Sequence, residues 1–340
     1  MADTNLSAAQ FRALYERLQG EARRGGADRR GALSYISAAQ VVAVARAVRT
    51  GRSVTLAAPV EHRVTADNPE PCEHQMMSPP GAEAPPAGLA FTYDRIAMNI
   101  HGDADSHLDA LCHVIYDAAL YNGVPADVVT AAGAAELSVE VASNGIVGRG
   151  VLLDIPRLRD VKWLEPGDHV TAADLAAAEE AQQVRVGQGD LLFVRVGHRR
   201  RRRELGPWDA ASARAGLHPS ALKFVSDRQV AVLGSDGNND TAPSPAQGVD
   251  YPVHVLAVNA MGMHLLDYLQ FEDLVPVCEA EERWSFLCVI APLRIVGGTG
   301  SPVNPIAIFL CRGSSPQSDG AVGQRGQTVT MAGPRSEYGG

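Results

Sequence analysis

Three apolar runs decide the fold: GRGVLLDI (residues 148–155), GDLLFVRVG (residues 189–197) and QVAVLGSDG (residues 229–237). Each run is almost continuously apolar at its centre, which is typical of strands that are covered on both faces. Between them stand two helical stretches, TAADLAAAEEAQQ (residues 171–183), with Thr171 placed to cap it, and HPSALKFVSDR (residues 218–228). Strands that alternate with helices indicate an α/β protein.

The segments before this centre predict a helical beginning and then a strand. Apolar spacing predicts one helix from about Ser7 to Leu18 and a second helix that Ser37 caps. SVTLAAPV (residues 53–60) has strand composition, and residues 61–88 have no clear periodicity, so we expect a long loop there. We therefore divide the chain into an N-terminal helical extension (1–52), a single domain (53–312) and a flexible C-terminal tail (313–340).

One later segment is ambiguous. HVLAVNAMGMHLLDYL (residues 254–269) is apolar with helical spacing in part, and it predicts either a third helix or a loop followed by one.

The run "HRRRRRELGPWD" contains five consecutive arginines, from Arg199 to Arg203. A nucleic-acid patch, a solvated loop and an arginine that pairs with a substrate carboxylate are the three interpretations, and the acidic chain favours the solvated loop.

Composition excludes several classes of protein. The formal net charge of −9 and the isoelectric point near 5.6 argue against a nucleic-acid partner. The sequence contains no apolar run approaching the ~20 residues that span a bilayer, so we expect no membrane partner. The five cysteines are widely spaced without a CxxC pair, which argues against a disulfide framework and favours a reduced, cytoplasmic location.

The densest group of potential ligands is HGDADSHLDALCHVIYDAALYNG, residues 101–123. If this stretch is extended, its odd-numbered polar residues share one face and could converge on one point; these are Asp103, Asp105, His107, Asp109 and His113. Carboxylate and imidazole ligands together suit a borderline divalent ion such as Mn²⁺, Zn²⁺ or Fe²⁺. An aspartate-rich loop without a metal uses the same residues, and composition and spacing alone leave both interpretations open.

SHLDALCH (residues 106–113) resembles the HxGTHxDxPxH signature of the cyclase family of metal-dependent hydrolases, which includes bacterial kynurenine formamidase and isatin hydrolase. Ser106 stands in place of Thr and Leu111 in place of Pro. The three apolar runs and APLRIVGGTGSPVNPIAIF (residues 291–309) resemble later family segments in the same order. The resemblance covers most of residues 53–310.

This resemblance implies a swivelling β/β/α fold and one divalent metal ion, Mn²⁺ or Zn²⁺, that activates water against a small amide or lactam. Carried over residue by residue, His107 and Asp109 are metal ligands and His113 is a general acid or base. The first histidine of the signature is missing, because Asp103 occupies that position. We interpret Asp103 as the third ligand and keep His101 as the reserve candidate.

Two further positions follow from the resemblance. Family members bring a later histidine and a glutamate to the metal site, and this chain offers His254 and Asp267 there. The expected function is hydrolysis of a C–N bond in a small-molecule substrate by a homodimer or homotetramer. Two alternatives remain: a cyclase or dehydratase of a biosynthetic pathway on the same fold, and a degenerate member that binds a small molecule without turning it over.

Overall fold

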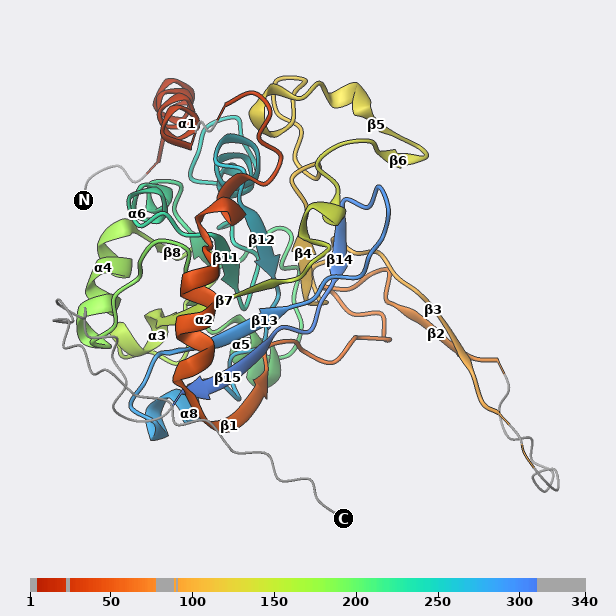
Figure 1. The fold of residues 1–340 in the computed structure, drawn as a ribbon, viewed down its shortest axis with the longest axis vertical. Helices are drawn as coiled ribbons and strands as arrows, with labels where there is room; N and C mark the ends of the chain where they lie inside the picture. The colour runs from red at the N-terminus through yellow and green to blue at the C-terminus, as the bar shows by residue number, and fades with distance from the viewer. Residues whose placement is uncertain (1–4, 23–24, 78–88, 90, 311–340) are drawn as a thin grey trace, which may run out of the picture.

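The computed structural model describes residues 5–22, 25–77, 89 and 91–310, so the expected tail at 313–340 lies outside the described residues. The main feature is a curled sheet of nine strands, with helices packed around it (Figure 1). Its order is β1 (Val48–Thr55), β15 (Ile306–Leu310), β13 (Ser285–Ile290), β7 (Ile146–Asp154), β9 (Leu191–Arg195), β11 (Val232–Ser235), β12 (His264–Asp267), β4 (His107–Asp109) and β14 (Gly300–Pro302).

The three apolar runs form the centre of this sheet, as the sequence predicts. β7, β9, β11 and β12 are parallel neighbours, whereas the strands outside them pair antiparallel. All five residues of β9 are buried, which explains its lack of apolar–polar alternation. The fold is therefore a mixed α/β single domain, and this prediction is confirmed.

Helices cover the central strands. α4 (Ala172–Ala181) begins with a capping box in which Thr171 accepts a hydrogen bond from the backbone N–H of Asp174. It packs against α3 (Ile155–Leu158) and α6 (Ala221–Asp227), whereas α2 (Ala38–Ala47) lies against β7 and β13 (Figure 1). Further elements are the helices α1 (Ala8–Ala22), α5 (His198–Leu205), α7 (Pro252–His254) and α8 (Val275–Ala280), and the short strand pairs β8 (His169–Val170) with β10 (Gly216–Leu217) and β5 (Val129–Thr130) with β6 (Gly133–Ala134). Short 3-10 helices lie at Gly31–Tyr35, Tyr121–Gly123, Ala126–Val128 and Val139–Ala142.

The N-terminal helices are continuous with the main core. Phe11 and Leu18 of α1 are buried in the same apolar cluster as the central strands. Ser37 caps α2 through a capping box, as expected, and the chain then enters β1 directly at Val48. β1 therefore runs across the boundary that the sequence suggested at residue 52. No helix among the described residues is both long and apolar enough to cross a bilayer.

The ambiguous segment at 254–269 is half helix and half strand. α7 continues into a π-helix (Val255–Ala260), but β12 then enters the sheet between β11 and β4. The helix ends because Gly262 has a positive φ of 65°, and the Tyr121 ring occupies the space that a side chain would need there. The prediction of a helix for the second half was wrong, because burial on both faces of the strand removes the alternation that would have revealed it.

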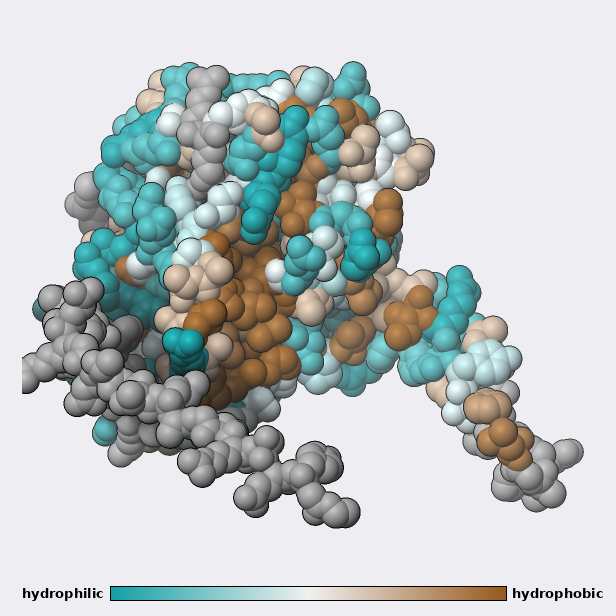
Figure 2. All heavy atoms as spheres, in the orientation of Figure 1, coloured by the Kyte–Doolittle hydropathy of each residue, from teal (hydrophilic) through white to brown (hydrophobic). Residues whose placement is uncertain are grey.

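Two other expectations need correction. Residues 61–88 contain β2 (Glu73–Met76), which pairs with β3 (Asp94–Ala97) in a hairpin that projects from the body (Figure 1). Apolar side chains are exposed along this β2–β3 arm (Figure 2).

The arginine run does not form a solvated loop either, because it lies in α5 and Arg199 is buried.

Candidate metal centre

Asp109 lies at the centre of the polar cluster. It ends β4, whose two neighbours are β12 and β14, and its side chain is fully buried. His107 and Asp109 are two residues apart on this strand and therefore share a face, as the odd-number pattern predicts. Two groups of ligand atoms meet at Asp109, and in each group all the atoms lie within 4.8 Å of one another.

The strand-side group consists of His107, Asp109 and Asp267, and all three are buried. Nδ1 of His107 is hydrogen-bonded to the carbonyl oxygen of Asp105 at 2.8 Å, which leaves Nε2 directed toward Asp109 Oδ1 at 3.7 Å. Asp267 pairs in register with His107 across β12 and β4. The Asp267 carboxylate accepts hydrogen bonds from Asn238 Nδ2 at 2.9 Å and from the backbone N–H of Asn239 at 3.1 Å, so its orientation is fixed.

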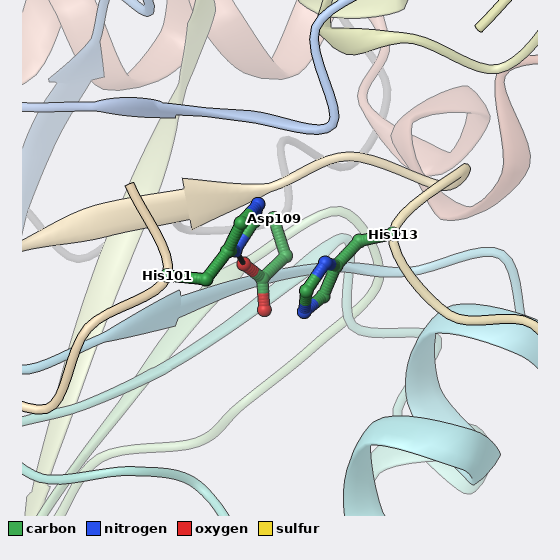
Figure 3. Close-up of side chains that lie close together, drawn as sticks. All are labelled: His101, Asp109 and His113. Carbon is green, nitrogen blue, oxygen red and sulfur yellow. Dashed lines mark hydrogen bonds and ion pairs between the residues drawn. The ribbon is translucent and has the colours of Figure 1, made fainter. Parts of the chain in front are cut away.

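The loop-side group consists of His101, Asp109 and His113 (Figure 3). Nδ1 of His101 lies 2.8 Å from Asp109 Oδ1, and its ring stacks on that of His113 with the centroids 3.7 Å apart. Nε2 of His101 is 3.0 Å from the hydroxyl of Thr299. Gly300 on β14 makes this position possible, because a Cβ there would lie 2.7 Å from the His101 ring and 2.5 Å from the Leu108 carbonyl oxygen.

His254 joins the two carboxylates of the cluster. Its Nε2 lies 3.3 Å from Asp109 Oδ2 and 3.3 Å from Asp267 Oδ2. Its Nδ1 is held by Asp240 Oδ2 at 2.6 Å, and the same Asp240 carboxylate accepts the backbone N–H of Val253 at 2.6 Å. Asp240 therefore fixes both the helix start and the imidazole orientation.

The mixture of carboxylates and imidazoles shifts the pKa values of the site. Burial disfavours the Asp109 carboxylate, but the surrounding histidines, His113 foremost, outweigh burial and hold its pKa well below the usual range. Burial also opposes the charged form of His254, yet Asp267, Asp109 and Asp240 raise its pKa well above the ordinary value. Burial lowers the pKa of His113 to about 4, despite the opposing effect of Asp109.

These residues suit a divalent metal ion. Asp109 Oδ2 is buried and makes no hydrogen bond to any described residue, although His254 Nε2 stands within ion-pair distance. His107 has the arrangement of a metal-ligating histidine, with one ring nitrogen fixed by a backbone carbonyl and the other turned toward the carboxylates. Oxygen and imidazole donors without thiolate are the ligands of catalytic Zn²⁺ and Mn²⁺ sites.

The structure brings together five of the six site residues that the sequence indicates. His107, Asp109 and Asp267 form one group, His113 belongs to the other, and His254 contacts both carboxylates. Asp103 lies outside both groups, because its Oδ1 accepts a hydrogen bond from the Tyr268 hydroxyl at 2.6 Å. The ligand role of Asp103 stays a prediction, and the reserve candidate His101 is the residue placed beside Asp109.

Sequence reasoning missed the residues that orient the cluster. Asn238, Asn239 and Asp240 hold Asp267 and His254, and none of them was singled out individually. The signal was present in the LGSDGNND stretch (residues 233–240), which follows the central strand β11. Polar residues that follow parallel strands frequently border a site in α/β sheets.

Fold and cluster together define a mixed α/β protein with a carboxylate–imidazole centre of the kind that holds a divalent metal ion. The sequence profile of the Cyclase family, described as "Putative cyclase", matches residues 47–239. A solved structure described as a novel cyclase is 30% identical, with a TM-score of 0.77, and the match covers 87% of this chain and 99% of that one. The chain therefore belongs to the cyclase family.

Two further solved structures share the fold. Isatin hydrolase A from Labrenzia aggregata, bound to benzyl benzoate, is 23% identical with a TM-score of 0.54, covering 77% of this chain and 94% of that chain. Isatin hydrolase A from Ralstonia solanacearum is 22% identical with a TM-score of 0.53, covering 75% and 91% respectively. A comparison with curated proteins finds no match.

Proposed function

We propose that this protein is a metal-dependent hydrolase that cleaves a C–N bond in a small amide or lactam. The observation that carries the proposal is the Asp109 carboxylate, fully buried, with one oxygen lacking a hydrogen bond and imidazoles around it. Membership of the cyclase family and the isatin hydrolase neighbours support an enzyme of this kind.

The residues that would hold the ion are Asp109 with His107 and Asp267 on one side and His101 on the other. The bound ion would supply Lewis acidity, which lowers the pKa of a water molecule and polarises a substrate carbonyl. Zn²⁺ and Mn²⁺ fit this mixture of oxygen and nitrogen donors best.

His113 is the residue we assign to proton transfer. Its ring borders the cluster, stacked on His101, and it is partly accessible, so a substrate could reach it. A positioned histidine that takes a proton from water and delivers it to a leaving nitrogen contributes about 10²–10⁴-fold to a rate. His254, oriented by Asp240, fixes the relative positions of Asp109 and Asp267 and completes the polar wall of the site.

The first experiment measures metal content by elemental mass spectrometry on the wild-type protein and on His107→Ala. We expect about one Mn or Zn per chain in the wild type and its loss in the variant. His74→Ala is the matched control, because His74 lies on the β2–β3 arm, paired with Asp94, and should leave the metal in place. A wild-type protein that holds no metal after loading with either ion would contradict the proposal and favour a binder without turnover.

The second experiment incubates the loaded protein with aryl formamides and lactams and follows the mass of the product. Hydrolysis of a lactam opens the ring and gives one product heavier by one water, whereas hydrolysis of an aryl formamide releases formate and leaves an arylamine lighter by one CO; a cyclase or dehydratase removes one water. Either hydrolysis product, if its formation disappears in His113→Ala, supports the hydrolase and the role of His113. Loss of water from any substrate would replace the proposal with the dehydratase alternative.

A further inference from the structure

Arg199 is a buried cation that the proposed site does not use. It is the second residue of α5, only 8% of its surface is exposed, and it forms no ion pair with a described residue. The next three arginines of the run all have carboxylate partners: Arg200 with Glu204, Arg201 with Glu165 and Arg202 with Asp67. Asp236 and Asp105 favour the Arg199 charge without forming an ion pair with it, and burying a charge with no direct counter-ion costs free energy, so we ask what the side chain does there.

The Arg199 guanidinium binds three backbone carbonyl groups instead. Nε donates to Leu269 at 3.1 Å, and Nη2 donates to Ala104 at 2.8 Å and also to Tyr268. Burial, together with neighbouring Arg202, lowers the pKa of Arg199 to about 10, so the side chain remains charged at neutral pH. The three carbonyl oxygens therefore receive charge-assisted hydrogen bonds, which are stronger than neutral ones.

These three carbonyls lie on the two segments that carry the strand-side ligands. Ala104 stands three residues before His107, and Tyr268 immediately follows Asp267. Tyr268 has a positive φ of 53°, a conformation that a bulky residue keeps only when its surroundings enforce it. The Ser106 hydroxyl also donates to the Tyr268 carbonyl, at 2.7 Å, and the Tyr268 hydroxyl donates to Asp103, so two side-chain bonds besides the clamp join the same two segments.

We propose that Arg199 is a positioning residue that clamps the segment before β4 to the end of β12 and thereby sets the spacing of His107 and Asp267 for the metal ion. This inference rests on the proposed function and deepens it. β4 has only three residues, and its antiparallel register with β12 covers only two pairs, Leu266 with Leu108 and Asp267 with His107. So short a ladder does not hold the spacing by itself, and the guanidinium supplies the bridge just beyond its end.

Arg199→Lys tests the clamp, because lysine keeps the charge and most of the stem but cannot span three carbonyls in one plane. We expect the dissociation constant for Mn²⁺ or Zn²⁺ to rise by about tenfold or more, as for other residues that orient metal ligands. Arg200→Lys is the matched control: it alters an exposed pair on the same helix and should leave the constant unchanged. Ser106→Ala, which removes the hydroxyl bond to the same Tyr268 carbonyl, should change the constant in the same direction by a smaller factor.

The readout that separates positioning from mere stability is the rise in melting temperature on adding metal. A residue that only stabilises the fold lowers the melting temperature of the metal-free and metal-loaded forms equally, whereas loss of the clamp shrinks the difference between them. An unchanged difference in folded Arg199→Lys, or an equal loss in Arg200→Lys, would overturn the proposal.

Hydrogen exchange keeps this test independent of the proposed function. If the wild type binds no metal, the proposed function fails, and the clamp is judged from amide exchange alone. Faster exchange in Arg199→Lys confined to residues 104–109 and 266–269 supports it. Exchange that is unchanged there, or faster throughout the chain, contradicts it.

Discussion

The two sides of Asp109 are built differently. The strand-side residues, His107 and Asp267, lie on paired strands, are almost completely buried and have their orientation fixed by Asp105, Asn238 and Asn239. The loop-side residues, His101 and His113, come from irregular chain before and after β4, and the His101 side chain is 24% exposed (Figure 3). His101 is held by Asp109 and Thr299, and the ring of His113 stacks on that of His101.

This difference suggests that the two groups around Asp109 have different functions. Under the proposed function, the strand-side pair would define where the ion sits, since rigid elements hold a geometry more precisely than loops do. The more exposed loop side would then be the side that meets a substrate, as functional loops on a rigid scaffold commonly do. Four substitutions test this comparison, in descending order of expected effect.

Asp109→Asn should have the largest effect, because both groups share this carboxylate. We expect metal affinity to fall by more than about 100-fold, beyond the range for residues that only support a ligand. Calorimetric titration with Mn²⁺ and Zn²⁺ measures it. Asp94→Asn, on the β2–β3 arm, is the control. Tight binding in Asp109→Asn would show that the two groups do not share one centre.

His107→Ala should weaken metal binding almost as much, because its imidazole is already oriented and cannot be replaced by a neighbouring residue. We expect a loss of about 100-fold in affinity, at the upper end of the range for residues that only support a ligand. Titration of the metal-free protein with Co²⁺, followed by visible absorption, gives both affinity and coordination geometry. If this variant binds as tightly as the wild type, the strand side is not the anchoring side.

His101→Ala should have a smaller effect on affinity than His107→Ala, because its partly exposed ring is held from a loop. We expect a loss of several-fold up to about tenfold. The Co²⁺ spectrum should change, since one nitrogen donor is lost. Equal losses in His101→Ala and His107→Ala would remove the distinction between the two sides.

Asp103→Ala should have the smallest effect on the metal. Its carboxylate is engaged by the Tyr268 hydroxyl, and the variant should lose about 1 kcal/mol of folding stability with that hydrogen bond. Metal content should stay close to one ion per chain by elemental mass spectrometry. A variant devoid of metal would establish Asp103 as a ligand, as its position in the signature suggests.

The sequence predicts the central strands and helices correctly, because the strands are buried on both faces and the helices begin with capping residues. Thr171 and Ser37 mark their helices through side-chain chemistry that depends only on local sequence. β12 was not readable. Its identity as a strand depends on β11 and β4, which lie far away in the chain, and its apolar residues fit a buried helix equally well.

The sequence predicts the candidate site correctly where residue spacing along a strand determines the geometry. It does not predict the positions of side chains that lie on irregular loops. His107 and Asp109 share a face because they lie on one strand. The signature also placed Asp103 at a ligand position, yet the irregular chain between residues 101 and 106 turns Asp103 toward Tyr268 and His101 toward Asp109. The sequence does not single out Arg199, because nothing in a run of five arginines shows which one the fold buries.

Gly300 carries a consequence for the evolution of this site. Its missing side chain provides the space for the His101 ring, although the two residues are far apart in sequence. A Cβ at position 300 would also lie 2.5 Å from the Leu108 carbonyl oxygen, so the strand backbone requires the glycine whether or not a histidine stands at position 101. The dependence therefore runs one way: related sequences that keep the histidine should always keep the glycine, whereas the glycine should persist in lineages that have lost the histidine.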